Sequence, residues 1–281
     1  MKILLFCSQC MQAAMKSETP PGTSLTEAWK AVPKTYFDVE GDFSFRLDCP
    51  RGHSHAYCLN VPHHELLFDA GVMSLERGAY REAVFSFAAS RERFAEFYLK
   101  VMAHARGRDF DAIERSWKAL DANSERQIGA FFWIGLVENG SPPEEADVAQ
   151  RWATFRNRVV HRGAFPSRQE TMEYGEHIWT LVRSCGADLQ AKFSQSYEDV
   201  KSRAYVLAAQ RLWSNGYKGG VGGFSVVTVI GGFEKTFEAS LASFRKGSGW
   251  ATPPGDMTVA QVAQRFGMPL ERLLEGLLGH T

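Results

Sequence analysis

The feature that most constrains this chain is a stretch of about 140 residues, beginning after Pro62, in which apolar residues recur at helical spacing. In its longest segment, 79–105, the apolar residues Val84, Phe87, Phe94 and Tyr98 follow intervals of three, four or seven. Glycines and prolines separate the successive segments, as they commonly do where helices end. Helices with one apolar face must bury that face against one another, so this stretch predicts a mainly α-helical bundle.

We expect successive helices at 66–77, 79–105, 110–120, 144–160, 167–187, 193–212 and 233–244. A further helix, between those at 110–120 and 144–160, is expected to begin at Ser124 as its N-cap. The interior of the helix after Ser124, residues 128–137, is apolar on every face. This pattern predicts burial all round, either in the bundle or against another subunit. Arg91 interrupts the apolar stripe of the longest helix, and we interpret it as an edge residue whose charged end reaches water or a polar site.

The first sixty residues have a different character. Cys7 and Cys10 form a C-x2-C pair after a short apolar strand at 3–6, and two more strands are expected within 36–48, joined at Gly41. The second of these runs into a segment, 49–58, that contains two cysteines and two histidines. Two turns that carry soft ligands and are separated by β-structure are typical of a zinc ribbon.

A tetrahedral zinc site needs four ligands, and Cys7, Cys10 and Cys49 supply three of them. The preferred fourth ligand is His53, because the neighbouring Gly52 can make the tight turn of a knuckle. Cys58, which would give an all-thiolate site with a longer loop, and His55 remain alternatives. A closed site of four protein ligands is structural. A segment of this size with few large core residues needs a bound metal to stabilise its fold.

The charge of the chain is balanced, with 32 basic and 32 acidic residues. Nucleic-acid binders often carry a basic excess, so an RNA site here must be a local cluster. The sequence offers one, formed by Arg151, Arg156, Arg158, Arg162 and Arg168. Apolar runs stay well below the about 20 residues that span a bilayer, and the first residues do not form a secretory signal. We therefore expect a cytoplasmic protein without membrane contact, with cysteines present as thiols or metal ligands.

The helix expected at 144–160 ends in a polar cluster. Its apolar residues form one narrow stripe and are Val148, Trp152, Phe155 and Val159. Arg156 projects at the edge of this stripe, whereas Asn157 and His161, an i,i+4 pair, project away from it. Arg and His are also ordinary residues at a helix C-terminus, where they interact with the last carbonyls and the helix dipole.

The sequence Arg156-Asn157-x3-His161, followed by Arg162-Gly163, resembles the R-x(4–6)-H motif of the HEPN superfamily of helical domains. The resemblance extends over residues 62–190, since that family also places the motif near the end of the penultimate helix of a four- to five-helix bundle. It implies a metal-independent endoribonuclease, in which two protomers bring their motifs to one dimer interface. The 2′-hydroxyl of RNA attacks the adjacent phosphorus and leaves a 2′,3′-cyclic phosphate.

The resemblance also implies a role for each motif residue. His161 is the general acid or base, Arg156 stabilises the charge on the phosphoryl oxygens, and Asn157 orients His161 or holds the phosphate. Arg158 and Arg162 bind flanking phosphates of the RNA or lower the pKa of the histidine. The expected setting is a toxin or a phage-defence system, with an antitoxin or another regulatory protein as a partner. The alternative is a non-catalytic dimeric HEPN-like module that recruits its partner through the zinc ribbon.

These patterns divide the chain into a zinc-ribbon-like domain at 1–60, a HEPN-like bundle at 61–190 and a mostly helical C-terminal extension at 191–281. In the extension, seven glycines within 216–232 surround an apolar run at 224–230, which we interpret as a strand or a buried connector. No Gly-Lys-Ser/Thr follows at the spacing of a phosphate loop. Two short helices around a Gly turn are expected within 258–278. They resemble the first half of a helix-turn-helix, but no clear third helix follows, so a helical hairpin that packs on the body is favoured.

Overall fold

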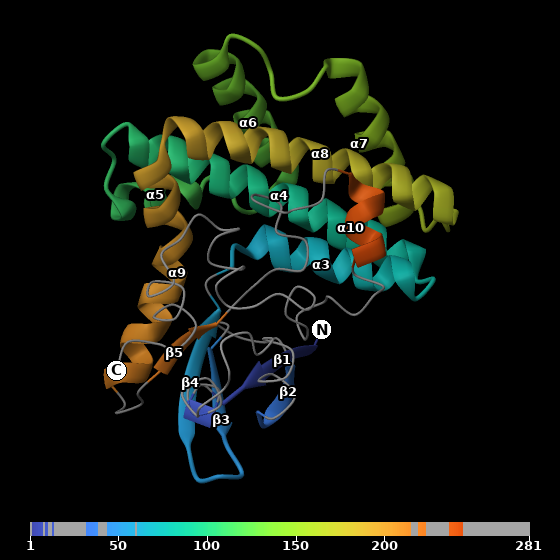
Figure 1. Ribbon diagram of the computed structural model, residues 1–281. Helices are drawn as coiled ribbons and strands as arrows, with labels where there is room; N and C mark the ends of the chain where they lie inside the picture. Colours follow the sequence, from blue (N-terminus) through green and yellow to red (C-terminus); the bar gives the residue numbers. More distant parts are fainter. Residues whose placement is uncertain are drawn as a thin grey trace. The chain divides into compact units, whose positions relative to one another are not determined.

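The computed structural model describes residues 2–7, 9–10, 13, 32–38, 44–59, 61–214, 219–222 and 236–243 (Figure 1). Over these residues the chain is mainly helical, with short strands near its N-terminus, as the sequence predicted. The described residues form two compact units. The first unit contains those within 2–59, 202–214, 219–222 and 242–243, and the second contains 61–201 and 236–241.

The first unit contains two small sheets. Strand β1 (Lys2–Phe6) pairs antiparallel with β2 (Lys34–Asp38), so that Ile3 lies opposite Phe37. In the other sheet, β3 (Ser44–Asp48) pairs antiparallel with β4 (Ser54–Leu59), and β5 (Gly219–Gly222) adds to β4 in parallel. The two strands expected within 36–48 are therefore present, but they belong to different sheets.

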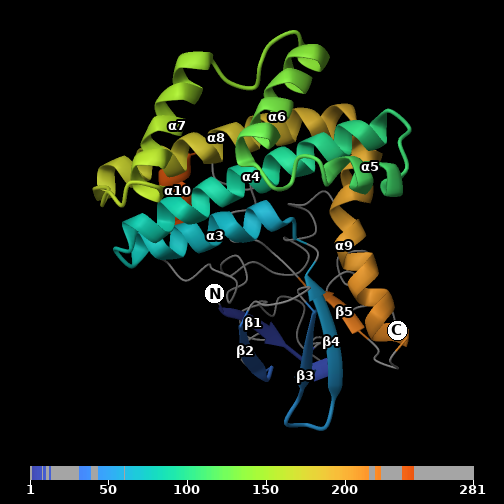
Figure 2. The ribbon, with the colours of Figure 1, turned by 180° about the vertical axis from the view of Figure 1, so that it is seen from behind.

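The second unit is a helical bundle whose central helix is α4. Its helices are α3 (His63–Glu76), α4 (Tyr80–Ala105), α5 (Phe110–Trp117), α6 (Ser124–Asn139), α7 (Ala146–Val160) and α8 (Arg168–Lys192). Parts of α9 (Ser194–Ser214) and α10 (Phe237–Ser243) also belong to it. Helix α4 contacts α3, α5, α6, α7 and α8. In the two opposite views, α4 and α8 run alongside each other, with α3 on one side of them and α6 and α7 on the other (Figures 1 and 2).

Local chemistry sets where several helices begin and end. Ser167 and Glu170 form a capping box at the start of α8, in which each side chain accepts a bond from the other residue's backbone N–H. The N-cap of α6 is Asn123, whose side chain accepts from two backbone N–H groups, so the prediction of Ser124 as the cap was wrong by one residue. Helix α6 ends at Gly140, which adopts a left-handed conformation with φ of 75°.

The core of the second unit contains a close fit between Phe87 and two glycines. A Cβ atom on Gly71 of α3 would lie 2.5 Å from the Phe87 ring, and one on Gly175 of α8 would lie 2.8 Å from it. Phe87 is fully buried and packs against Phe68 and Phe237. The absence of side chains at the two glycines therefore allows α3 and α8 to close around this ring.

Helix α6 is not buried all round in this chain. Its buried residues are Gln127, Phe131 and Gly135, whereas Trp133 is 69% exposed and Val137 is 60% exposed. The helix packs against α4. The prediction that this segment lies inside the bundle was wrong for its outer face. The other option, burial against a second subunit, stays a prediction.

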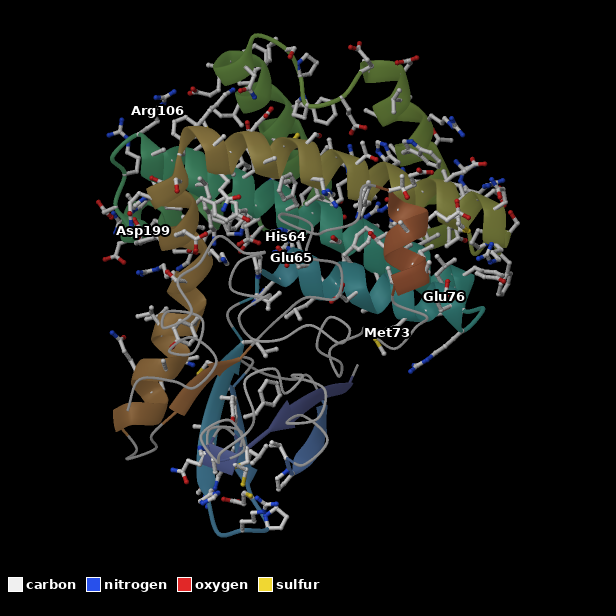
Figure 3. The ribbon with its side chains drawn as sticks, in the orientation of Figure 1. His64, Glu65, Met73, Glu76, Arg106 and Asp199 are labelled. Atoms are coloured by element: carbon white, nitrogen blue, oxygen red, sulfur yellow. The ribbon has the colours of Figure 1, made fainter. Side chains whose placement is uncertain are left out.

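Buried charged residues lie at the start of α3, where Figure 3 labels His64 and Glu65. Burial lowers the pKa of His64 to about 3. Burial, and then the neighbouring Asp69, raise the pKa of Glu65 to about 8. Because both groups lose hydration on folding, both favour their uncharged forms at neutral pH.

The expected strand at 224–230 and the expected helices within 258–278 lie outside the described residues. Among the described helices, none is both long enough and apolar enough to cross a membrane.

Candidate functional site

The first candidate site is a cluster of four side chains in the first unit. The ligand atoms of Cys7, Cys10, Cys49 and His53 all lie within 4.8 Å of one another. The Sγ atoms of Cys10 and Cys49 are 3.7 Å apart, and His53 Nδ1 lies 3.3 Å from Cys7 Sγ and 3.4 Å from Cys10 Sγ. Ligands at tetrahedral corners about 2.0–2.3 Å from a metal are separated by about 3.3–3.8 Å. The four side chains thus fit a metal site.

The turn between β3 and β4 brings two of these ligands together. Cys49 N–H donates to the His53 carbonyl at 2.7 Å, and Gly52 N–H donates to the Cys49 carbonyl at 2.9 Å. Gly52 has a φ of 83°, a conformation that side chains disfavour. Gly52 thus makes the tight turn on which the sequence-based choice of His53 rested.

The two alternative ligands lie in different surroundings. His55 is buried, and its Nε2 atom is 3.1 Å from Cys7 Sγ. It therefore contacts one member of the four-residue cluster without being part of that cluster. Cys58 is buried among Tyr205, Ala208 and Ala209 of α9. The described geometry therefore favours His53 as the fourth ligand.

The thiols of the cluster differ in acidity. Burial raises the pKa of the Cys7 thiol to about 12. Burial also opposes ionisation of Cys49, but hydrogen bonds, first that from Arg51 N–H, outweigh it and lower the pKa of Cys49. A bound divalent cation stabilises thiolates, so it would remove the desolvation penalty that a buried thiolate carries without one.

The second candidate site is the polar end of α7. His161 is the C-cap of this helix, and its backbone N–H donates to the Asn157 carbonyl at 3.0 Å. The Arg156 Nη1 atom donates to Asn157 Oδ1 at 3.0 Å and lies 3.1 Å from His161 Nε2. The Arg156 guanidinium thus contacts both Asn157 and His161, although the helical projection had placed these two residues on a different face of the helix from Arg156. His161 is exposed and Arg156 is half-buried.

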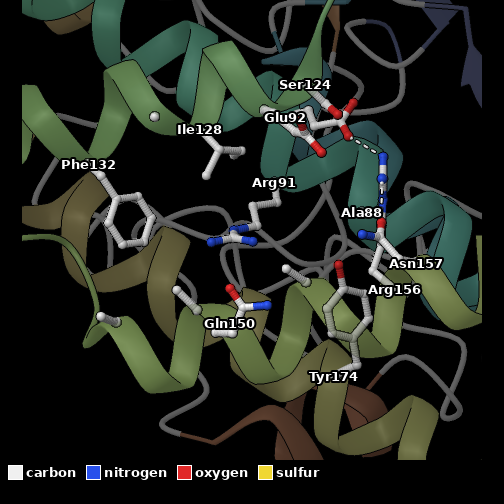
Figure 4. A pocket seen from close by; sticks show the side chains of 15 residues that line it. Ala88, Arg91, Glu92, Ser124, Ile128, Phe132, Gln150, Arg156, Asn157 and Tyr174 are labelled. Carbon is white, nitrogen blue, oxygen red and sulfur yellow. Dashed lines mark hydrogen bonds and ion pairs between the residues drawn. The ribbon is translucent and has the colours of Figure 1, made fainter.

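The other side of the Arg156 guanidinium is held by Glu92, which the sequence analysis did not single out. The Nη2 atom of Arg156 donates to Glu92 Oε1 of α4 at 2.9 Å (Figure 4). The two side chains are only 22% and 23% exposed. The sequence does not predict Glu92 as the partner of Arg156, because only the packing of α4 against α7 shows which carboxylate contacts this arginine.

The predicted arginine cluster is largely neutralised. Arg158 donates to Glu170 at 2.6 Å, and Arg151 lies 3.4 Å from Glu173. Both contacts are made with α8, whereas Arg156 contacts α4, so Arg156 and Arg158 lie on different sides of α7. The N–H of Ser167 first, and then Arg158, lower the pKa of Glu170 to about 2. Arg162 is exposed next to His161.

A groove adjoins the motif between α6 and α7, with α4 and α8 beneath it (Figure 4). Arg156 and Asn157 line it, and so does Arg91, the residue that interrupts the apolar stripe of α4. Arg91 donates to Glu144, whose other carboxylate oxygen lies 3.1 Å from His177 Nε2. That second contact lies off the direction of a hydrogen bond, since neither atom has a hydrogen-bond partner. The interpretation of Arg91 as an edge residue whose charged end reaches water was wrong, because its side chain is only 9% exposed. Its pairing with Glu144 in the groove lining agrees with the alternative, a polar site.

No protein-family model matches the sequence, and comparisons with curated proteins and with solved structures gave no significant match.

Proposed function

We propose that this protein is a metal-independent endoribonuclease of the HEPN type. The observation that carries the proposal is the contact of Arg156 Nη1 with both Asn157 and His161 at an accessible helix end. An arginine donor beside an imidazole suits phosphoryl transfer without a metal, because one group stabilises charge while the other moves a proton. The resemblance of the motif and of the helix order supports the same conclusion.

In the proposed reaction, the 2′-oxygen of RNA forms a bond to the adjacent phosphorus and the bond from phosphorus to the 5′-oxygen breaks. His161 accepts the 2′-hydroxyl proton or protonates the leaving 5′-oxygen, and the second protomer's copy of the same residue performs the other transfer. Arg156 neutralises the charge on the phosphoryl oxygens. Asn157 holds Arg156 through their hydrogen bond, and the exposed Arg162 binds a flanking phosphate.

The proposed dimer uses the outer face of α6 and its surroundings. Trp133, Leu136 and Val137 are exposed there, and Phe165, four residues after His161, is 86% exposed. Exposed apolar surface of this kind is typical of an interface. Trp133→Asp should therefore reduce the solution mass from that of a dimer to that of a monomer and abolish RNA cleavage.

In the same proposal, Cys7, Cys10, Cys49 and His53 hold a structural zinc ion that takes no part in the cleavage. Thiolate and imidazole ligands in a closed tetrahedral set suit zinc. The expected setting remains a toxin or a phage-defence system in which a regulatory protein restrains the nuclease.

The direct test is to incubate the purified full chain with total cellular RNA in EDTA. We expect cleavage that leaves 2′,3′-cyclic phosphate ends. Arg156→Ala and His161→Ala should each reduce the rate by at least about 10²-fold, which is typical for loss of one catalytic group. Arg108→Ala is the matched control, because Arg108 is exposed between α4 and α5. Intact RNA under these conditions would sink the proposal.

The second candidate function is a non-catalytic dimeric module that recruits a partner. It is favoured by the pairing of Arg156 with Glu92 and of Arg158 with Glu170, which leaves little free positive charge for RNA. The nuclease assay distinguishes the two functions. A module predicts a folded dimer that neither cuts RNA nor loses its partner when His161 is replaced by Ala.

A further inference from the structure

The groove between α6 and α7 has the size and the lining of a small-ligand site. Its volume is about 390 Å³, within the range of about 300–1,000 Å³ that is common for such sites. Ile128 and Phe132 line it from α6, and Ala149 and Ala153 line it from α7. These walls offer apolar surface to both faces of a planar ring, and an aromatic side chain is a common stacking partner for a nucleobase.

The floor of the groove contains a hydrogen-bond donor that is not used within the described part of the chain. The Arg91 side chain is only 9% exposed, and one of its terminal nitrogens donates to Glu144. Its Nε atom is buried and has no hydrogen-bond partner among the described residues. Figure 4 shows the Arg91 guanidinium between the two walls. Because the Nε atom has almost no accessible surface, a ligand in the groove can accept only from the remaining terminal nitrogen, which also has no hydrogen-bond partner among the described residues.

The charges around the groove argue against a phosphate as its occupant. Arg91 is paired with Glu144 and Arg156 with Glu92, and Glu125 also lines the groove. Because both arginines already contact carboxylates, the lining has no excess positive charge that would attract an anion. A neutral group that both donates and accepts hydrogen bonds suits this lining better than a phosphate does.

We propose that the groove binds a guanine base, that of the RNA nucleotide next to the cleaved bond. This inference rests on the ribonuclease function proposed above. Arginine donates to the O6 and N7 acceptors of guanine, the commonest specific contact between proteins and bases. A glutamate of the lining accepts from the N1–H and N2–H donors on the opposite edge. Adenine carries an acceptor at N1, which a carboxylate repels, and a single pyrimidine ring reaches fewer of these groups.

The position of the groove links base recognition to the cleavage site. Arg156 and Asn157 line the groove and also belong to the cluster that contains His161. A base held between α6 and α7 thus places its own phosphate beside the imidazole. Arg91 and Glu92 are the residues that determine specificity in this arrangement.

The experiment is calorimetric titration of the full chain with 5′-GMP, 5′-AMP, 5′-CMP and 5′-UMP, which share one phosphate and differ in the base. We expect 5′-GMP to bind about tenfold or more tightly than the others, the discrimination of one good bidentate contact. Ala149→Leu fills the groove from the α7 wall and should reduce the affinity for 5′-GMP by a similar factor. Ala187→Leu, on an exposed position of α8, is the matched control and should leave the affinity unchanged.

Arg91→Lys adds a test of the donor itself. Lysine keeps a positive charge beside Glu144 but lacks the guanidinium fork, so the preference for 5′-GMP should fall while the helical circular dichroism stays the same. Equal affinities for the four nucleotides, absence of binding, or an unaltered affinity in Ala149→Leu would overturn the inference. Preferential binding of 5′-GMP without RNA cleavage would refute the ribonuclease and leave the base site standing. RNA cleavage without a preference for 5′-GMP would refute the guanine site and leave the ribonuclease standing.

Discussion

The two units of this protein are stabilised by different chemistry. In the first unit, the described strands are four to six residues long, and the four side chains of the candidate metal site lie outside these strands. In the second, the fully buried side chains include Phe68, Phe87, Phe94, Phe131 and Tyr174, which form a large aromatic core. In this comparison, the first unit contains a cluster that fits a metal ion, whereas the second contains a large apolar core. Perturbing one unit should therefore leave the other intact.

The largest effect should come from the metal ligands. Cys7→Ser should abolish binding of about one zinc ion per chain and unfold the first unit, because structural zinc sites contribute about 10–16 kcal/mol of binding free energy. The helical circular dichroism of the second unit should persist. Metal content by mass spectrometry and circular dichroism on the same sample check both results. Cys58→Ala is the control and should keep its zinc, whereas a folded wild-type protein without any metal would contradict the site.

A smaller effect is expected from the aromatic core. Phe87→Ala removes a fully buried ring between Gly71 and Gly175, and it should lower the free energy of unfolding by about 3–5 kcal/mol. Zinc content should not change. Urea denaturation followed by circular dichroism measures the loss. Phe85→Ala, at a half-exposed position on the same helix, should cost less than about 1 kcal/mol. Equal losses in the two variants would refute the proposed core.

The smallest effect is a pH dependence of the second unit. The pKa of Glu65 is about 8 in the folded chain against 4.5 as its ordinary value, so the folded state holds a proton that the unfolded state has lost between these pH values. Stability therefore falls as the pH rises from 4.5 to 8, by at most about 1.4 kcal/mol per pH unit.

His64 acts in the opposite direction below pH 6.5, because its pKa is lowered to about 3. The range from pH 6.5 to 8 thus isolates Glu65. Glu65→Gln should lose less stability than the wild type between these two pH values in urea denaturation. Glu82→Gln, at an exposed position of α4, should behave as the wild type does. A wild-type stability that rises over this range would exclude the buried uncharged carboxyl.

Much of the fold could be predicted because it depends on local chemistry. The periodicity of 79–105 predicted α4 almost to its ends, since one apolar face of a helix requires that spacing. Gly52 and the cysteine spacing predicted the cluster of Cys7, Cys10, Cys49 and His53, since a tight turn and four ligands of suitable type define such a site. The exposure of Trp133 could not be predicted in this way. An apolar residue is equally compatible with burial in its own chain and with burial against another, and periodicity does not distinguish these cases.

The motif at the end of α7 shows the same division. The sequence by itself determined the order of Arg156, Asn157 and His161 on one helix, since their spacing is fixed by the helical repeat. Only the tertiary structure decided that Glu92 holds Arg156, that Arg158 contacts α8 and that Arg91 enters the groove beside the motif. These contacts join residues far apart in the chain. They depend on how whole helices pack, and the sequence of a single helix contains no record of which helices lie beside it.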